Sequence, residues 1–126
     1  MNQDDARRIQ KALKLCELEP SIRPEGINFT TLPSGTSFFF GDPQGISTNV
    51  PWSIVEQMFL ASMLRFIVVH DMSFGVVVSR DMYAVVGAYG AVYAKTLFDA
   101  LIEACQALRK IKTGEIKLER PTEDKG

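Results

Sequence analysis

The sequence contains little of what most catalytic and metal-binding sites require. Its 126 residues include one histidine, His70, and two cysteines, Cys16 and Cys105, which lie far apart in the chain. These residues fit neither a disulfide framework nor a structural zinc site, which needs several such ligands at short spacing. No Ser–His–Asp order and no compact pair of carboxylates in an apolar segment stands out. We therefore expect a non-enzymatic protein that binds no cofactor or metal and keeps two reduced, buried cysteines.

An excess of charge of one sign is also lacking. The chain has 14 Lys and Arg against 15 Asp and Glu, so its net charge is −1. Broad electrostatic binding of nucleic acid or of an anionic membrane needs clustered basic residues, and only a local basic face could supply them here. The N-terminus is polar, and the longest nearly uncharged stretch, 82–94, is shorter than the roughly 20 residues of a membrane span. These absences predict a cytoplasmic protein with no membrane segment.

Residues 4–19 have the pattern of an amphipathic helix. Ala6, Ile9, Leu13 and Cys16 recur at helical spacing and form a narrow apolar stripe, and Pro20 ends the pattern. Because the stripe is narrow, this helix could pack at the edge of the fold or against a second subunit. Ile9 and Leu13 are therefore candidate interface residues.

Two strands, 27–32 and 36–41, are predicted next. Turn residues at 33–35 separate them, which favours a hairpin, and a polar turn is expected at 42–45. The run Phe38, Phe39, Phe40 breaks strict alternation, so either both faces of the second strand are covered or one ring is exposed. Because an exposed ring could contact a partner, Phe39 is a further candidate interface residue.

The stretch from 49 to 112 indicates a helix, strands and a final helix. Asn49 is expected to cap the first helix, and Trp52 at its entrance is expected to anchor the core or to contact a partner. The valine-rich runs 66–70 and 74–79 are predicted to be central strands that pair as a hairpin around Met72.

Residues after that hairpin complete the predicted core. Residues 82–86 favour a third strand, while the range 82–94 as a whole is compatible with a strand or a loop. Thr96 followed by Asp99 resembles a capping box at the start of the last helix, and Gly114 can terminate that helix.

Together these patterns predict an α+β fold in which an antiparallel sheet packs with helices in a layered sandwich. The approximate order is α-β-β-α-β-β-(β)-α in a single domain over 1–114. This domain comprises an N-terminal helix (1–19), a hairpin (27–41) and a helix–strands–helix core (49–112). The charged tail 115–126 is expected to be mostly mobile, with a short edge strand at 115–119 as an alternative.

One cluster of side chains could bind a flat or anionic ligand. Tyrosines beside glycines can form an aromatic floor, and arginines at the same end of a sheet can attract an anion. The candidate ligand-binding residues are Arg65, Arg80, Tyr83, Tyr89 and Tyr93. The same tyrosines could instead be half-buried residues at the end of a sheet.

Two local motifs do not support a catalytic or phosphate site. His70 and Asp71 would point to opposite faces if both lay within a strand, so they should not pair as an acid–base couple. The segment Gly87-Ala88-Tyr89-Gly90 departs from a Walker A loop and brings none of the positive charge that a GXXG nucleic-acid loop needs. We interpret it as a flexible turn.

A family resemblance enters with the segment Ser47-Thr48-Asn49-Val50-Pro51-Trp52-Ser53-Ile54-Val55-Glu56-Gln57-Met58. This segment resembles the first helix of small bacteriophage proteins of the phage ABA-sandwich type, and residues 96–105 resemble their last helix. The resemblance covers about half of the chain, residues 47–111, and rests on patterning. It implies a helix–sheet–helix sandwich and a phage or prophage origin, and it supplies no activity and no functional residues. The order helix–strands–helix also resembles a double-stranded-RNA-binding domain, but the basic cluster that opens that domain's last helix is absent.

Three classes of function follow from these observations. The first is a phage accessory protein that acts without catalysis by binding a host protein, such as a regulator or a component of a defence system. The second is a small-ligand or nucleotide binder that uses the tyrosine and arginine residues, and the third is a nucleic-acid-binding module. A homodimer through the first helix or the hairpin is compatible with each of them.

Overall fold

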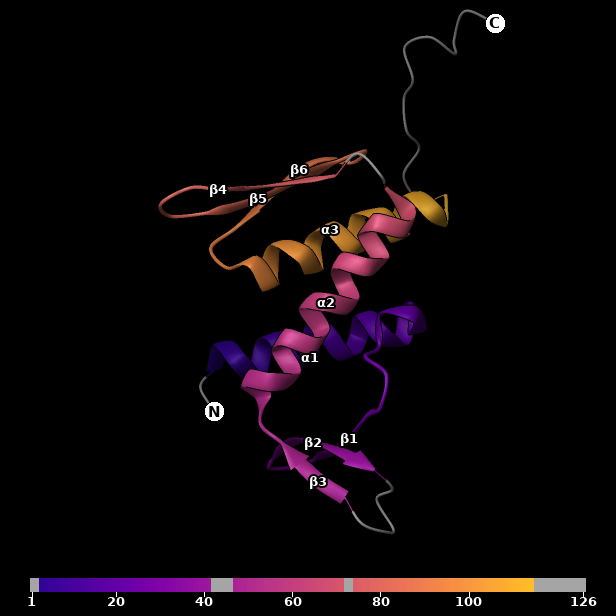
Figure 1. Cartoon of the computed structure of the whole chain (residues 1–126), viewed down its shortest axis with the longest axis vertical. Coiled ribbons are helices and arrows are strands. Elements are labelled where there is room, and N and C mark those ends of the chain that lie inside the picture. The colour runs from indigo at the N-terminus through magenta and orange to yellow at the C-terminus, as the bar shows by residue number, and fades with distance from the viewer. Residues whose placement is uncertain (1–2, 42–46, 72–73, 115–126) are drawn as a thin grey trace, which may run out of the picture. The chain divides into compact units, whose positions relative to one another are not determined.

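The computed structural model describes residues 3–41, 47–71 and 74–114, which form an α+β fold with antiparallel sheets (Figure 1). Within these residues the order is α1-β1-β2-β3-α2-β4-β5-β6-α3, which confirms the predicted class and most of the predicted order. The chain divides into two compact units, Met1–Phe66 and Ile67–Gly126, and the boundary falls inside α2. The turn predicted at 42–45 and the tail 115–126, with its alternative strand at 115–119, lie outside the described residues.

The first unit begins with the predicted amphipathic helix. Helix α1 spans Gln3–Leu18 and carries Asp4 and Asp5 in its first turn, where negative charge favours the helix N-terminus. Its buried side chains are Ile9, Ala12, Leu15 and Cys16. A short 3-10 helix, Pro20–Ile22, follows because proline cannot continue the α-helical hydrogen bonding.

The β1–β3 sheet contains the predicted hairpin and one strand that was not predicted. Strands β1 (Ile27–Leu32) and β2 (Gly35–Gly41) pair antiparallel, with Thr30 opposite Ser37. Strand β3 (Ser47–Val50) pairs with the other edge of β2 and places Asn49 opposite Phe39. The prediction that Asn49 caps a helix is therefore wrong. Backbone pairing with β2 holds this residue in an extended conformation.

Helix α2 spans Trp52–His70 and is longer than the pattern predicted. It begins after Pro51, whose carbonyl accepts hydrogen bonds from Ile54 N at 3.0 Å and Val55 N at 3.2 Å. The strand predicted at 66–70 is wrong, because this segment continues the helix. The burial pattern explains the difference, since Phe66 and Ile67 are buried and continue the row of Phe59 and Met63 at helical spacing.

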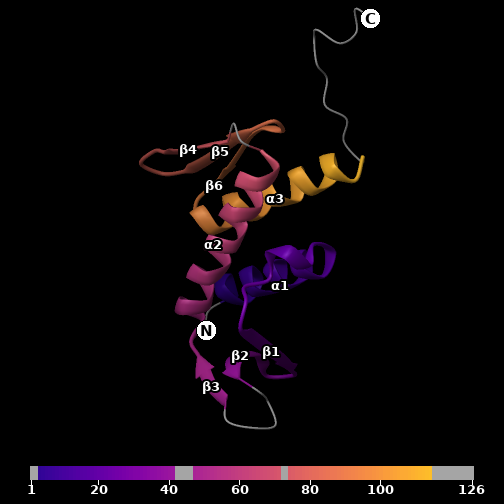
Figure 2. The same ribbon diagram turned by 45° about the vertical axis from the view of Figure 1, so that its right-hand side comes forward.

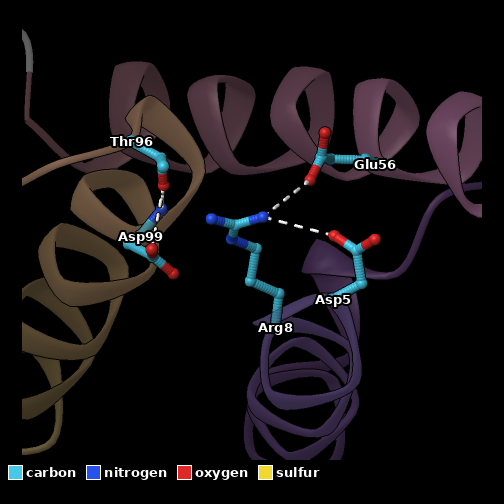
Figure 3. Close-up of polar contacts among 5 residues, drawn as sticks. All are labelled: Asp5, Arg8, Glu56, Thr96 and Asp99. Carbon is cyan, nitrogen blue, oxygen red and sulfur yellow. Dashed lines mark hydrogen bonds and ion pairs between the residues drawn. The ribbon is translucent and has the colours of Figure 1, made fainter. Parts of the chain in front are cut away.

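Among the described residues, α2 is also the one helix with the length and apolarity of a membrane span. Its 19 residues include a window with a mean hydropathy of 1.5. Core helices of soluble proteins share these properties. Glu56 lies within this helix and makes an ion pair with Arg8 of α1 at 4.0 Å, and Figure 3 shows the Arg8 guanidinium between the carboxylates of Glu56 and Asp5. The ion pair joins the first turns of α2 to α1, and 33% of the apolar window of α2 is buried.

The second unit consists of a three-stranded meander and the last helix. Strands β4 (Gly75–Val78), β5 (Tyr83–Gly87) and β6 (Gly90–Ala94) pair antiparallel in this order, so the range 82–94 forms two strands around a tight turn. Helix α3 (Leu97–Lys112) packs against β5 and β6, and Figure 2 shows it running along one face of this sheet.

Helix α3 starts at the predicted cap. The Thr96 hydroxyl accepts a hydrogen bond from Asp99 N at 3.2 Å and donates one to the Asp99 carboxylate at 2.9 Å (Figure 3). Gly114 follows the helix with φ of +83°, a conformation that favours glycine, and its N–H donates to the carbonyl of Ile111. The sequence therefore predicted both ends of this helix.

Candidate functional site

The β4–β6 sheet presents an apolar surface opposite the side that α3 covers. Paired residues of neighbouring strands lie on the same face, and alternate residues of one strand lie on opposite faces. Val85 is fully buried, so its face is the covered one. The register then assigns six residues to the other face, which we call the outer face: Gly75, Val77, Ala84, Val86, Ala91 and Tyr93.

Four of the six outer-face residues are exposed, Gly75 and Ala84 are half-buried, and none of the six is charged. Val77 is 57% exposed and Tyr93 is 60% exposed, and Val86 is exposed as well. A contiguous apolar surface of this kind is typical of a protein or membrane contact. The tyrosine on this face favours a protein contact, because tyrosine is enriched where proteins bind one another.

Strand β4 is exposed on both of its faces, which corrects a prediction. Its valine run indicated a central strand with little solvent on either side. In the structure β4 is an edge strand of four residues, and Val76, Val77 and Val78 are all exposed. The physical reason is coverage, because α3 packs on β5 and β6 and leaves the β4 side chains beyond its reach.

A buried carboxylate fixes the turn between β5 and β6. Asp71 is 6% exposed and is the one buried charged residue in the described part of the chain. Its Oδ2 accepts a hydrogen bond from Ala88 N at 2.7 Å, and its own N–H donates to the carbonyl of Ile67 in α2. A Cβ added to Gly87 would overlap this carboxylate, so glycine permits the close approach. No local pattern predicted this role for Asp71, because the contact joins residues 17 positions apart.

Tyr89 lies in the same turn, beside the Asp71 carboxylate. Its hydroxyl oxygen is buried and has no hydrogen-bond partner among the described residues. Burial raises the pKa of Tyr89 to about 12, and the negative charge of Asp71 and that of the Cys105 thiolate formed at strongly alkaline pH add to this effect. The hydroxyl therefore keeps its proton at neutral pH and cannot serve as a general base there.

The two cysteines are protonated at neutral pH as well. Burial raises the pKa of the Cys105 thiol to about 12 and that of Cys16 to about 11, with Arg23 partly offsetting the effect at Cys16. A thiol needs its deprotonated form to act as a nucleophile or metal ligand, so neither has the chemistry of a reactive cysteine. Within residues 3–41, 47–71 and 74–114, no three His, Cys, Asp or Glu side chains are grouped as a metal site requires.

The sheet places the three candidate tyrosines apart. Tyr83 is opposite Ala94 on the face that α3 covers, whereas Tyr93 is opposite Ala84 on the outer face. Tyr89 occupies the turn at the far end of β5. One aromatic floor would need these rings on one face, and the alternation of the strands prevents this.

The candidate arginines follow different elements. Arg80 is exposed in the β4–β5 turn, near the end of the sheet that Tyr83 occupies. Arg65 is an exposed residue of α2 and belongs to the first unit. The hairpin around Met72 that was expected to bring both arginines to one sheet end is wrong, because 66–70 is helical.

The residues predicted for an interface lie in the first unit. Ile9 and Phe39 are buried core residues, whereas Leu13 and Trp52 are half-buried. Trp52 continues an aromatic row whose successive ring centroids are 5.7–6.3 Å apart and whose other members are Phe29, Phe38 and Phe59. This row identifies Trp52 as a core anchor, the first of its two predicted roles.

The chain matches no family model, no curated protein and no solved structure. The resemblance to phage ABA-sandwich proteins over residues 47–111 therefore stays a prediction.

Proposed function

We propose that the protein acts without catalysis, by binding another protein through the outer face of the β4–β6 sheet. The observation that carries this proposal is the exposure of an uncharged sheet face on which Val77 and Tyr93 are each more than half exposed. Burying such a face against a partner releases water from apolar surface, at roughly 25 cal/mol per Å². The outer face itself contains no side chain that could act as a nucleophile or general base at neutral pH, which favours binding over chemistry at this site.

The resemblance to phage proteins suggests the class of partner. In this proposal the protein is a phage or prophage accessory protein in the bacterial cytoplasm, and its partner is a host regulator or a component of a host defence system. The pairing would be stoichiometric, since a binder without catalysis must occupy each target molecule. Ligand binding by the tyrosines and arginines receives less support, because the sheet distributes the tyrosines over two faces and a distant turn.

The test compares partner capture by two variants with the same chemical change. Val77→Glu places a charge on the outer face, and Val69→Glu places the same charge on an exposed position of α2. We expect a tagged full-length chain to recover one stoichiometric protein from bacterial lysate, Val77→Glu to lose it and Val69→Glu to retain it. Far-UV circular dichroism of both variants serves as the folding control.

Two results would contradict the proposal. One is a partner that both variants retain equally, because the outer face would then not be the binding surface. The other is recovery of lipid or nucleic acid in place of a protein. Lipid would indicate that the exposed apolar surface contacts a membrane, and nucleic acid would indicate binding through basic residues.

A further inference from the structure

The free edge of β4 is short, but it lacks the other devices that normally protect a strand edge. In the described residues β4 pairs with β5 only, so one side of Gly75–Val78 carries unpaired backbone groups. Protected edges are very short, or they carry lysine, proline, a bulge or a covering segment. The β4 sequence, Gly-Val-Val-Val, has no charge and no proline, and its register with β5 has no bulge.

The direction of the backbone groups along this edge follows from one hydrogen bond. Ser79 N donates to the carbonyl of Met82 at 2.9 Å, so the backbone of Ser79 faces β5. Successive residues of an antiparallel strand turn their N–H and C=O groups to alternate sides. Val78 and Val76 therefore turn theirs away from β5, and Val77 turns its groups toward Ala84.

This arrangement is self-complementary, and we propose that β4 pairs antiparallel with β4 of a second copy of the chain. A two-fold axis perpendicular to the sheet at Val77 brings Val76 of each copy opposite Val78 of the other. The outward backbone groups of these two residues then meet in hydrogen-bonded pairs, and the two Val77 side chains face each other across the axis.

The same register is compatible with the charges that flank β4. Asp71 and Arg80 lie beyond the two ends of the strand, and the axis places Arg80 of one copy opposite Phe74 of the other rather than opposite a like charge. The exposed Val76 and Val78 side chains acquire apolar neighbours on the α3 side of the joined sheet.

Joining the two edges also enlarges the proposed binding surface. A perpendicular axis keeps both outer faces on the same side, so the two three-stranded sheets become one six-stranded sheet with a continuous apolar surface. The larger surface extends the proposed function. Pairing of the β4 edges is argued separately, and its test measures association of two copies and not capture of a partner.

The test uses cross-linking of the purified full-length chain. A cysteine at a non-hydrogen-bonded antiparallel pair faces its counterpart at about 4.5 Å between Cα atoms, which is within disulfide range. We expect Val77→Cys to form a disulfide-linked dimer under mild oxidation. Tyr93→Cys, equally exposed on β6, should remain monomeric on a non-reducing gel. The native thiols are buried and protonated and should not contribute.

A second variant and a mass measurement keep the inference falsifiable. Val78→Lys adds the edge lysine that protected strands carry, so it should be monomeric by analytical ultracentrifugation where the native chain is dimeric. A monomeric native chain, or equal cross-linking of Val77→Cys and Tyr93→Cys, would overturn the inference. Dimerisation only after removal of residues 115–126 would also overturn it and would assign the edge to the tail. Loss of the dimer in Val78→Lys with partner capture unchanged would leave the proposed function intact.

Discussion

The two sheets of this protein share three antiparallel strands in sequential order, yet they are covered very differently. In the β1–β3 sheet, Phe38 is buried and its ring lies 5.7 Å from that of Trp52 at the start of α2. In the β4–β6 sheet, Val85 is the fully buried strand residue, and most of the other valines are exposed. The comparison shows that strand order does not decide which sheet is closed.

The difference comes from the reach of the side chains. Aromatic rings span the distance from a strand to a neighbouring helix and keep favourable contacts over 4.5–7 Å between centroids. Valine has a short branched side chain that needs a helix directly above it, and α3 lies above β5 and β6 only. Aromatic side chains therefore help to close the first sheet, whereas the second sheet keeps an exposed apolar face.

The largest effect is expected from Phe38→Ala. The change removes a buried ring that contacts Phe29 and Trp52, so it should lower the free energy of unfolding by about 3–5 kcal/mol. Denaturant titration followed by the fluorescence of Trp52, the single tryptophan, measures it. Val77→Ala is the matched change in the other sheet and should stay within about 0.5 kcal/mol, because that side chain is exposed. Equal losses would remove the distinction between the two sheets.

A smaller loss is expected from Gly87→Ala. The added methyl group would overlap the Asp71 carboxylate, and forcing it in should cost about 1–3 kcal/mol of unfolding free energy. Gly75→Ala is the control in the same sheet, because nothing lies within 4 Å of its added Cβ. Combining Gly87→Ala with Asp71→Ala should recover part of the loss, since the overlap disappears. Additive losses in this double-mutant cycle would show that the carboxylate is not the obstacle.

The free energy of unfolding should fall as the pH rises above 9. The unfolded chain loses the Cys105 proton near the ordinary pKa of 9.0, whereas burial raises the folded-state pKa to about 12. Between these values the folded state binds more protons, so its stability is complete below pH 9 and falls as pH rises toward 12. One such group contributes a slope of up to about 1.4 kcal/mol per pH unit. Cys105→Ala should flatten a series of denaturant titrations over this range, and an unchanged slope would contradict the raised pKa.

The smallest effects are expected from the partly buried polar contacts. Thr96→Ala removes the cap of α3 and should cost about 1 kcal/mol, as measured by thermal unfolding. Glu56→Gln removes an ion pair at 4.0 Å in which both side chains are partly exposed, so it should cost less than about 1 kcal/mol and less still at high salt. A larger loss for Glu56→Gln than for Thr96→Ala would reverse this ranking.

Local patterns predicted the elements whose signals lie within a few residues. The Thr96–Asp99 cap and the β1–β2 turn each need only short-range geometry, and both are confirmed. The stripe predicted for α1 is confirmed at Ile9 and Cys16 only, because the helix buries Ala12 and Leu15 and leaves Ala6 exposed. The errors at 49 and at 66–70 have another origin. β-Branched residues favour strands on average, but Phe66 and Ile67 continue a buried row on a helix, and pairing with β2 overrides the capping preference of Asn49.

The candidate site was less accessible to sequence reasoning. The sequence pattern singled out Tyr83 and Tyr93, but their separation onto opposite faces depends on a register that no local pattern fixes. The contact between Asp71 and Ala88 and the exposure of β4 depend on how distant segments pack. The sequence shows that β4 has no charged residue, and this predicted a buried central strand. In the structure the same uncharged strand is an exposed edge.

The sequence by itself determined the α+β class, the ends of α3 and the chemistry that the side chains can offer, because these follow from local backbone preferences and residue types. Only the tertiary structure decided which strand became an edge, which sheet face stayed uncovered and which carboxylate became buried. Coverage depends on the position of helices relative to strands, and that position is set by the sum of many long-range contacts rather than by any one segment.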